Sequence, residues 1–269
     1  MKFRPHALTN AIVRVSFVCE FAMPLGEQSL LKLHAIHGRF AEELPKVSIN
    51  RGFTIMLGTG IVQQQPILDG VASVTFEEYG RAGTLIKAFH ALPTMMLFIN
   101  QKYKRWKDVW PEAQGVLAAA LDAVPEAQVQ AFGLEYVDRF TAPTSEGSLD
   151  VTGLLKTSSQ YLVPRVFQIP GPWHSHHGSL RDDDSSPCPH SKNANINVDL
   201  VREPGPVEQF AVNMMLRHRR VLPKPLPARQ ALDFLSIFME EMHEADRTVM
   251  LDLLTDEAAH EISLGGKNA

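Results

Sequence analysis

The chain has 269 residues, of which 45% are hydrophobic and 21% are charged, and its formal net charge is −4. These proportions are typical of a soluble globular protein with one large domain or two smaller ones. The acidic balance argues against nucleic acid or an anionic membrane as the general partner. Two cysteines, Cys19 and Cys188, exclude a disulfide-rich scaffold, and no apolar run is long enough to predict a membrane span. We therefore expect a cytoplasmic protein.

The first half of the chain alternates between strand and helix patterns. Apolar residues at every second position predict a strand over 11–21, and apolar residues at helical spacing predict a helix over 30–44. The elements expected after these are strands over 47–57, 71–79, 84–89 and 94–99, a helix over 106–121 and a strand over 132–140. Neighbouring strands with helices between them predict an α+β fold, with a largely antiparallel sheet flanked by amphipathic helices.

The second half begins after a Pro- and Gly-containing segment, 142–147, which is the best candidate for a linker. It divides the chain into an N-terminal lobe of residues 1–145 and a C-terminal lobe of residues 146–269. We expect two apposed lobes, or one compact unit built from both. The elements expected in the second lobe are a strand near 161–169, a His-rich loop, a hairpin over 196–216 with its turn at 203–206, and a helix over 232–254.

The His-rich segment from His174 to His190 holds four of the eleven histidines and one of the two cysteines. Imidazole and thiolate are zinc ligands. In an extended chain His174 and His176 project from one face, and Cys188 and His190 repeat the same spacing. These four residues predict a tetrahedral zinc site, either structural or, with water as one ligand, catalytic. The alternative is an exposed loop, which its Gly, Ser and Asp content also favours.

Two further groups of histidines fit a helix surface better than a metal site. His34 and His37 are three residues apart, which places them side by side on a helix, but no carboxylate partner adjoins them at a recognised spacing. The run His243–Asp246 resembles the start of a metalloprotease motif, yet Arg247 stands where the second histidine is required. We interpret both groups as exposed polar residues.

Two basic stretches offer a local site for nucleic acid. Lys102–Lys107 contains three lysines and an arginine beside Tyr103 and Trp106, and Arg217–Arg220 lies at the end of a strand. Basic and aromatic side chains together can bind single strands. Trp106 and Trp110, however, are four residues apart at helical spacing, which is typical of a core. Nucleic acid is therefore an alternative partner and not the expected one.

Several short motifs follow the order found in a known group of proteins: Asn10–Ile12, Tyr103–Trp106 and Leu134–Arg139. Asn197–Asp199 and a helix containing Leu235 and His243 continue the order. On these motifs the chain resembles an uncharacterised, sporadically distributed family of bacterial proteins of about this length.

The chain departs from that family at four positions, three of which are polar. Ala11 and Arg14 replace a proline and a glutamate, and Glu135 and Asp138 replace an arginine and an asparagine. The resemblance supports the predicted α+β architecture and implies no particular activity.

No motif in the chain combines a nucleophile with its base, a general acid with a base, or a loop for a cofactor. The leading hypothesis is therefore a protein that acts by binding a partner, most simply another protein, and needs no cofactor. The alternatives are a zinc enzyme or zinc-stabilised protein, and a local nucleic-acid binder. The sequence leaves the oligomeric state open.

Overall fold

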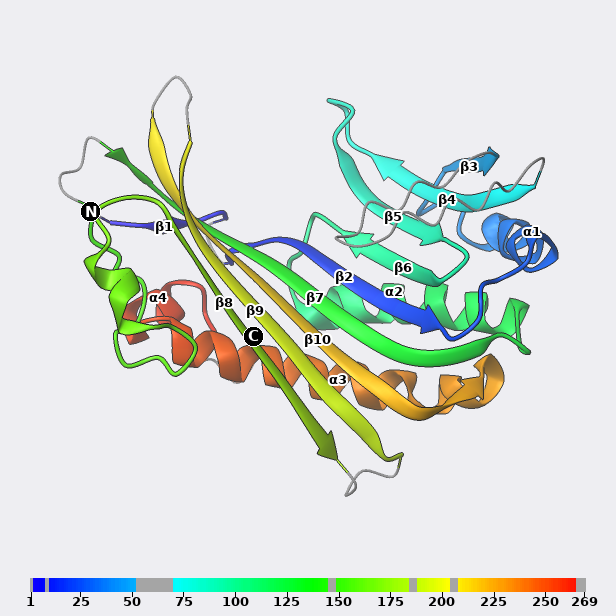
Figure 1. Ribbon diagram of the computed structural model, residues 1–269. Helices are drawn as coiled ribbons and strands as arrows, with labels where there is room; N and C mark the ends of the chain where they lie inside the picture. The colour runs from blue at the N-terminus through cyan, green and yellow to red at the C-terminus, as the bar shows by residue number, and fades with distance from the viewer. Residues whose placement is uncertain are drawn as a thin grey trace.

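The structure is a computed structural model that describes residues 2–7, 10–51, 70–144, 149–183, 188–203 and 208–264. These residues form one large antiparallel sheet with helices packed against it, which confirms the predicted α+β class (Figure 1). Parts of four predicted features lie outside the described residues: the strand over 47–57, the linker over 142–147, the His-rich loop over 174–190 and the turn over 203–206.

The sheet has ten strands, and every pairing between its named strands is antiparallel. Its strands follow the order β3 (Lys46–Arg51), β4 (Val71–Tyr79), β5 (Leu85–Ala91), β6 (Met95–Asn100), β2 (Ile12–Phe21), β7 (Gln128–Pro143), β10 (Gln209–Pro227), β9 (His190–Glu203) and β8 (Trp173–Asp183). The short strand β1 (Arg4–Pro5) pairs with β7. Because β7 pairs with β2 on one side and with β10 on the other, the two halves of the chain share one sheet.

The helical elements are α1 (Glu27–Ala35), η1 (Ile36–Arg39), α2 (Trp106–Ala123), η3 (Pro164–Gln168), α3 (Ala228–Leu253) and α4 (Asp256–Glu261). Helix α3 runs along β7 and β10, and it also contacts α2 (Figure 1). None of the helices in the described parts of the chain has both the length and the apolar composition needed to cross a bilayer. Two expectations about these helical elements differ from the structure. The predicted helix over 30–44 is α-helical as far as Ala35 and then tightens into a 3₁₀ turn, and the strand expected near 161–169 is the 3₁₀ helix η3, which begins at Pro164.

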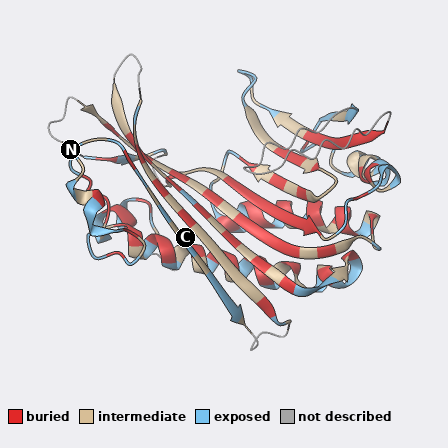
Figure 2. Cartoon of the chain, in the orientation of Figure 1, coloured by how far each residue is buried: buried red, intermediate tan, exposed pale blue. Residues whose placement is uncertain are grey.

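Apolar side chains form two clusters beneath the sheet. The first is packed between α1, α2, the first part of α3 and strands β2 to β7, and the second lies between β7 to β10 and the C-terminal end of α3. Figure 2 shows the buried residues at alternate positions along the central strands. The clusters do not follow a division at residue 145, because Phe3 and Ala11 belong to the second cluster and Ala228, Leu235 and Met242 belong to the first.

We call the face of the sheet that carries neither apolar cluster the outer face. On β9 its residues are Asn193, Asn195, Asn197 and Asp199, which align with Arg219, Arg217, Met215 and Asn213 of β10. All of these positions are partly or fully exposed. Side chains alternate between the two faces of a strand, so the polar outer face and the apolar inner face come from the same strands.

Candidate functional site

The His-rich segment forms a hairpin, and the prediction of a loop there is wrong. Trp173 aligns with Leu200 and Asp183 aligns with His190, so β8 lies beside β9 for its full length of eleven residues. The Gly, Ser and Asp residues of this segment favour a loop locally, but pairing with a strand that is itself held by β10 outweighs that preference.

The hairpin divides the four predicted zinc ligands into two pairs. His176 aligns with Asn197, whereas His190 aligns with Asp183, seven positions away along the ladder. At about 3.3 Å per residue, this separates the pairs by roughly 23 Å. One ion therefore cannot contact both pairs. Among the described residues, no three His, Cys, Asp or Glu side chains gather in a way that could hold a metal ion.

His174 and His176 lie on the outer face, where residues of β9 orient their rings. His174 Nδ1 contacts the Asp199 carboxylate, and His176 Nδ1 contacts the side-chain oxygen of Asn197. The side chain of His174 is 61% exposed. As the alternation of a strand predicts, His177 points to the other face. There its ring packs edge to face with Tyr161, with 5.2 Å between the ring centroids. The first pair of histidines is thus a solvent-facing pair.

His190 lies on the inner face and belongs to the contact between sheet and helix. Its side chain is buried, its Nδ1 lies 2.9 Å from the Cys188 carbonyl oxygen, and its ring packs at 4.7 Å from Phe238. Its Nε2 lies 3.6 Å from the Glu241 carboxylate of α3. Burial raises the pKa of the Cys188 thiol, which disfavours the thiolate that both ligation and nucleophilic attack require.

His34 and His37 do not act as a pair, because His37 has contacts of its own. His37 Nε2 donates to the Leu44 carbonyl oxygen at 2.9 Å, and its ring lies 4.9 Å from Phe76 in the first apolar cluster. Its role is therefore to close the turn after α1, and not to form a polar stripe with His34.

The basic stretch Lys102–Lys107 does not present its tryptophan to solvent. Trp106 and Trp110 are buried and stack on one another with 5.6 Å between their centroids, as their helical spacing predicts. Their faces are occupied by protein, so they cannot stack on bases as a single-strand binding site would require.

The second basic stretch is matched by acidic side chains. Arg219 binds both carboxylate oxygens of Glu20, at 2.9 and 2.5 Å, and Arg217 lies 3.4 Å from the same group. Arg220 is buried against Glu241 of α3 at 3.2 Å. These ion pairs reduce the positive potential that would attract phosphates.

A cluster of largely buried titratable side chains lies between α3 and the sheet, and no motif in the sequence predicts it. We call it the polar cluster; its members are Tyr103, Tyr136, Asp138, His218, His243 and Asp246. The interpretation of His243–Asp246 as an exposed run is wrong at both ends, because His243 is 7% and Asp246 is 6% exposed. The helical spacing of the sequence is consistent with this burial. Four buried residues lie on one face of α3: Met239, His243, Asp246 and Met250.

One part of the polar cluster joins two carboxyl groups and a histidine. His218 of β10 lies with its Nε2 3.4 Å from Asp246 Oδ1 of α3, without hydrogen-bond geometry. Burial raises the pKa of Asp138 well above its ordinary value, and the charge of Asp246 raises it further. Burial also raises the pKa of Asp246, while the contact with His218 partly lowers it. Both carboxyl groups are therefore shifted toward their protonated forms, Asp138 more strongly than Asp246.

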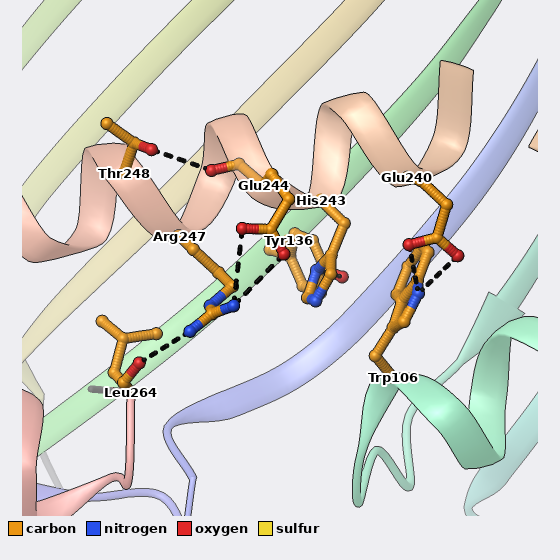
Figure 3. Close-up of polar contacts among 8 residues, drawn as sticks. All are labelled: Trp106, Tyr136, Glu240, His243, Glu244, Arg247, Thr248 and Leu264. Atoms are coloured by element: carbon orange, nitrogen blue, oxygen red, sulfur yellow. Dashed lines mark hydrogen bonds and ion pairs between the residues drawn. The ribbon is translucent and has the colours of Figure 1, made fainter. Parts of the chain in front are cut away.

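The other part joins β7, α2 and α3 through ring contacts (Figure 3). The Tyr136 hydroxyl lies 3.0 Å from His243 Nδ1, and the His243 ring stacks on Trp106 at 4.2 Å with planes 4° apart. The Trp106 indole donates to both carboxylate oxygens of Glu240, at 3.0 and 3.1 Å. Burial lowers the pKa of His243 to about 4, so the ring is neutral at neutral pH and can accept the Tyr136 proton.

The polar cluster sits where the two apolar clusters meet along α3. Residues before His243 pack into the first apolar cluster, and residues from Val249 onward pack into the second. The cluster does not line the surface hollow formed by Lys2, Leu154, Glu257 and His260. Catalysis requires that a substrate reach the reacting groups, whereas these groups are covered by α3. The arrangement is suited to fixing the position of α3 on the sheet.

The hairpin leaves one edge of the sheet open. β8 is the last strand in the sheet order, and within the described residues it pairs with β9 alone (Figure 1). Its inner-face residue Trp173 is buried, whereas Leu180 on its outer face is 69% exposed. The backbone groups on the far side of an edge strand can pair with another strand.

No protein-family model matches the chain, and none of the curated proteins does either. A functional proposal therefore depends on the geometry described above.

Proposed function

We propose that this protein acts in the cytoplasm by binding a protein partner, whose extended segment pairs with the open edge of β8. The observation that carries the proposal is the edge itself: eleven residues in strand conformation, held on one side by β9. An added strand gains main-chain hydrogen bonds for affinity, and it gains side-chain contacts at alternate positions for specificity.

The exposed side chains of β8 support this use of the edge. His174, His176 and Leu180 project from the outer face, and Leu180 is the most exposed large apolar residue among those described. Natural sheets commonly protect a long edge with charged side chains, proline or a bulge. The register of β8 with β9 is continuous, the strand contains neither lysine nor proline, and its charged residues lie only at its C-terminal end, at Arg181–Asp183.

The polar cluster and the basic stretches favour partner binding over catalysis or nucleic-acid binding. The polar cluster is covered by α3, and Arg217 and Arg219 are engaged by Glu20. A catalytic or nucleic-acid role would require these groups to be accessible. In the part of the chain that the structure describes, the far side of β8 is unpaired.

A photocrosslinking amino acid placed at Leu180 tests the proposal in living cells. Val47 on β3, at the opposite edge of the sheet, is the matched control because it is also an exposed apolar residue on an edge strand. We expect a discrete crosslinked protein from position 180 and none from position 47. Equal crosslinking from the two edges, or no product from position 180, would contradict the proposal.

A further inference from the structure

We infer that the partner of β8 is a second copy of this chain, with the two β8 strands paired antiparallel about Gly178. The inference rests on the proposed function, because it names the partner for the same edge. Most homo-oligomers are twofold symmetric, and in such a dimer the same patch contacts itself. A strand can pair with itself in this way only if its sequence is compatible with its own reverse.

The first supporting feature is the position of Gly178, which is the midpoint of Trp173–Asp183. A twofold axis at this residue pairs every position of β8 with a position of the other copy. An antiparallel ladder of this length forms about ten hydrogen bonds, which is the number found in an ordinary protein interface.

The second feature is charge complementarity on the outer face. With the axis at Gly178, His174 of each copy lies opposite Asp182 of the other, so the complementary pair occurs twice. His174 contacts Asp199 through Nδ1, which leaves Nε2 directed away from that contact. Asp182 accepts from Ser191 through one carboxylate oxygen, Oδ1. A carboxylate has a second oxygen that can accept the imidazole proton.

The other pairs in this register are also compatible. His176 lies opposite Leu180, Ser175 lies opposite Arg181, and no residue lies opposite one of like charge. A shift of the axis to Ser179 would place Arg181 opposite His177 and leave Trp173 beyond the ladder. A shift to His177 would leave Asp182 without an opposite residue in β8. The axis at Gly178 is therefore the register that the sequence of β8 favours.

The dimer would join the two ten-stranded sheets into one continuous sheet. The helices of both copies would lie on the same face, because the inner faces of the two β8 strands continue one another. The joined outer face would then carry two copies of the His174 and His176 pair, one on each side of the axis.

A disulfide at the axis tests the register directly. Residues opposite each other in an antiparallel pair have Cα atoms about 4.5–5.5 Å apart, which is within the range for a disulfide. In a Cys188→Ser background, Gly178→Cys should therefore crosslink two copies rapidly under mild oxidation. An added Cβ at Gly178 would have Asn195 Oδ1 at 3.5 Å as its nearest neighbour, so the substitution fits the fold.

Leu180→Cys in the same background is the matched control. Position 180 lies opposite position 176 of the other copy, so the two introduced thiols are four positions apart along the ladder, about 13 Å. We expect no disulfide from this variant. Equal crosslinking of the two variants would overturn the register.

Sedimentation velocity tests the dimer without a crosslink. We expect the 29.9 kDa chain to assemble to twice its mass with a dissociation constant of roughly micromolar. Asp182→Lys places a lysine opposite His174 and should weaken the dimer at least tenfold, while Val47→Lys at the opposite edge should leave it unchanged. Circular dichroism of each variant confirms that the fold is retained.

The outcomes separate the inference from the proposed function. If the chain stays monomeric and position 180 crosslinks to a different protein, the inference of a second copy is wrong and the proposed binding edge is retained. A monomer without any crosslinked product from position 180 overturns both. A dimer that Asp182→Lys does not weaken overturns the pairing of β8 with itself.

Discussion

The hydroxyl of Tyr136 on β7 lies 3.0 Å from Nδ1 of His243 on α3, and this contact joins the centre of the sheet to its longest helix. The two residues are 107 positions apart in the chain. Around them lie Trp106, Asp138 and Asp246, so several titratable groups are buried at one junction. The stability of the fold should therefore depend on pH in ways that single substitutions can separate.

His243 should make the fold sensitive to acid. Its pKa is lowered from 6.5 to about 4 by burial, so the unfolded chain takes up a proton at a pH where the folded chain does not. The stabilisation is complete above pH 6.5 and is lost as the pH falls toward 4, by up to about 3 kcal/mol. His243→Gln cannot titrate, so its free energy of unfolding should fall less between pH 7 and pH 4.5 in urea titrations.

The exposed His260 on α4 provides the control for this measurement. His260→Gln should retain the full loss of stability in acid. If both variants follow the same pH dependence as the natural chain, His243 does not carry the effect.

Asp138→Asn should stabilise the protein at neutral and alkaline pH. The pKa of Asp138 is raised well above its ordinary value by burial and by Asp246, so the folded state holds a proton that the unfolded state releases. Stability is therefore lost as the pH rises above the ordinary value of 3.8 and through the raised pKa. The amide is neutral without taking up a proton, so this cost of folding disappears, and we expect a gain of about 1–3 kcal/mol at pH 8.

The gain should shrink as the pH approaches 4, because the natural carboxyl group is then protonated in both states. Asp122→Asn, at an exposed position on α2, should change the stability little at any pH. A loss of stability at pH 8 for Asp138→Asn would show that the ionised carboxylate is the favoured form.

Glu240→Ala should destabilise the fold through Trp106. It removes both acceptors of a largely buried indole N–H, at a cost of about 1–2 kcal/mol. Tryptophan fluorescence should report the change, because the environment of the indole is altered. Glu244→Ala one turn later removes a contact of an exposed side chain with Arg247 and should cost less. Equal effects of the two variants would contradict a specific role for the indole bond.

Zinc should not bind to the hairpin with all four predicted ligands. By the register of β8 and β9, His176 lies roughly 23 Å from His190, and His174 lies farther from it. Treatment of the purified, tag-free protein with a chelator should therefore leave its melting temperature unchanged. Zinc near one ion per chain that is lost in a His176→Ala, Cys188→Ala double variant would contradict the separation of the pairs.

The sequence by itself determined the elements whose apolar residues recur with a clear period. Strand β4 begins and ends where the alternating pattern predicts it, at Val71 and Tyr79, and α2 begins at the predicted Trp106. Strands β9 and β10 also pair with each other, as the alternation over 196–200 and 210–216 predicts. These patterns are local and reflect the burial of one face, so they can be recognised without knowing what covers that face.

The tertiary structure alone decided which polar residues are buried and which lie together. His243 and Asp246 occupy the apolar face of α3, but their burial depends on Tyr136 and His218, which come from distant strands. The His-rich segment is a strand because β9 pairs with it, although its composition favours a loop. Cross-strand pairing and helix packing join residues that are far apart in sequence. The local periodicity of apolar residues does not identify those partners.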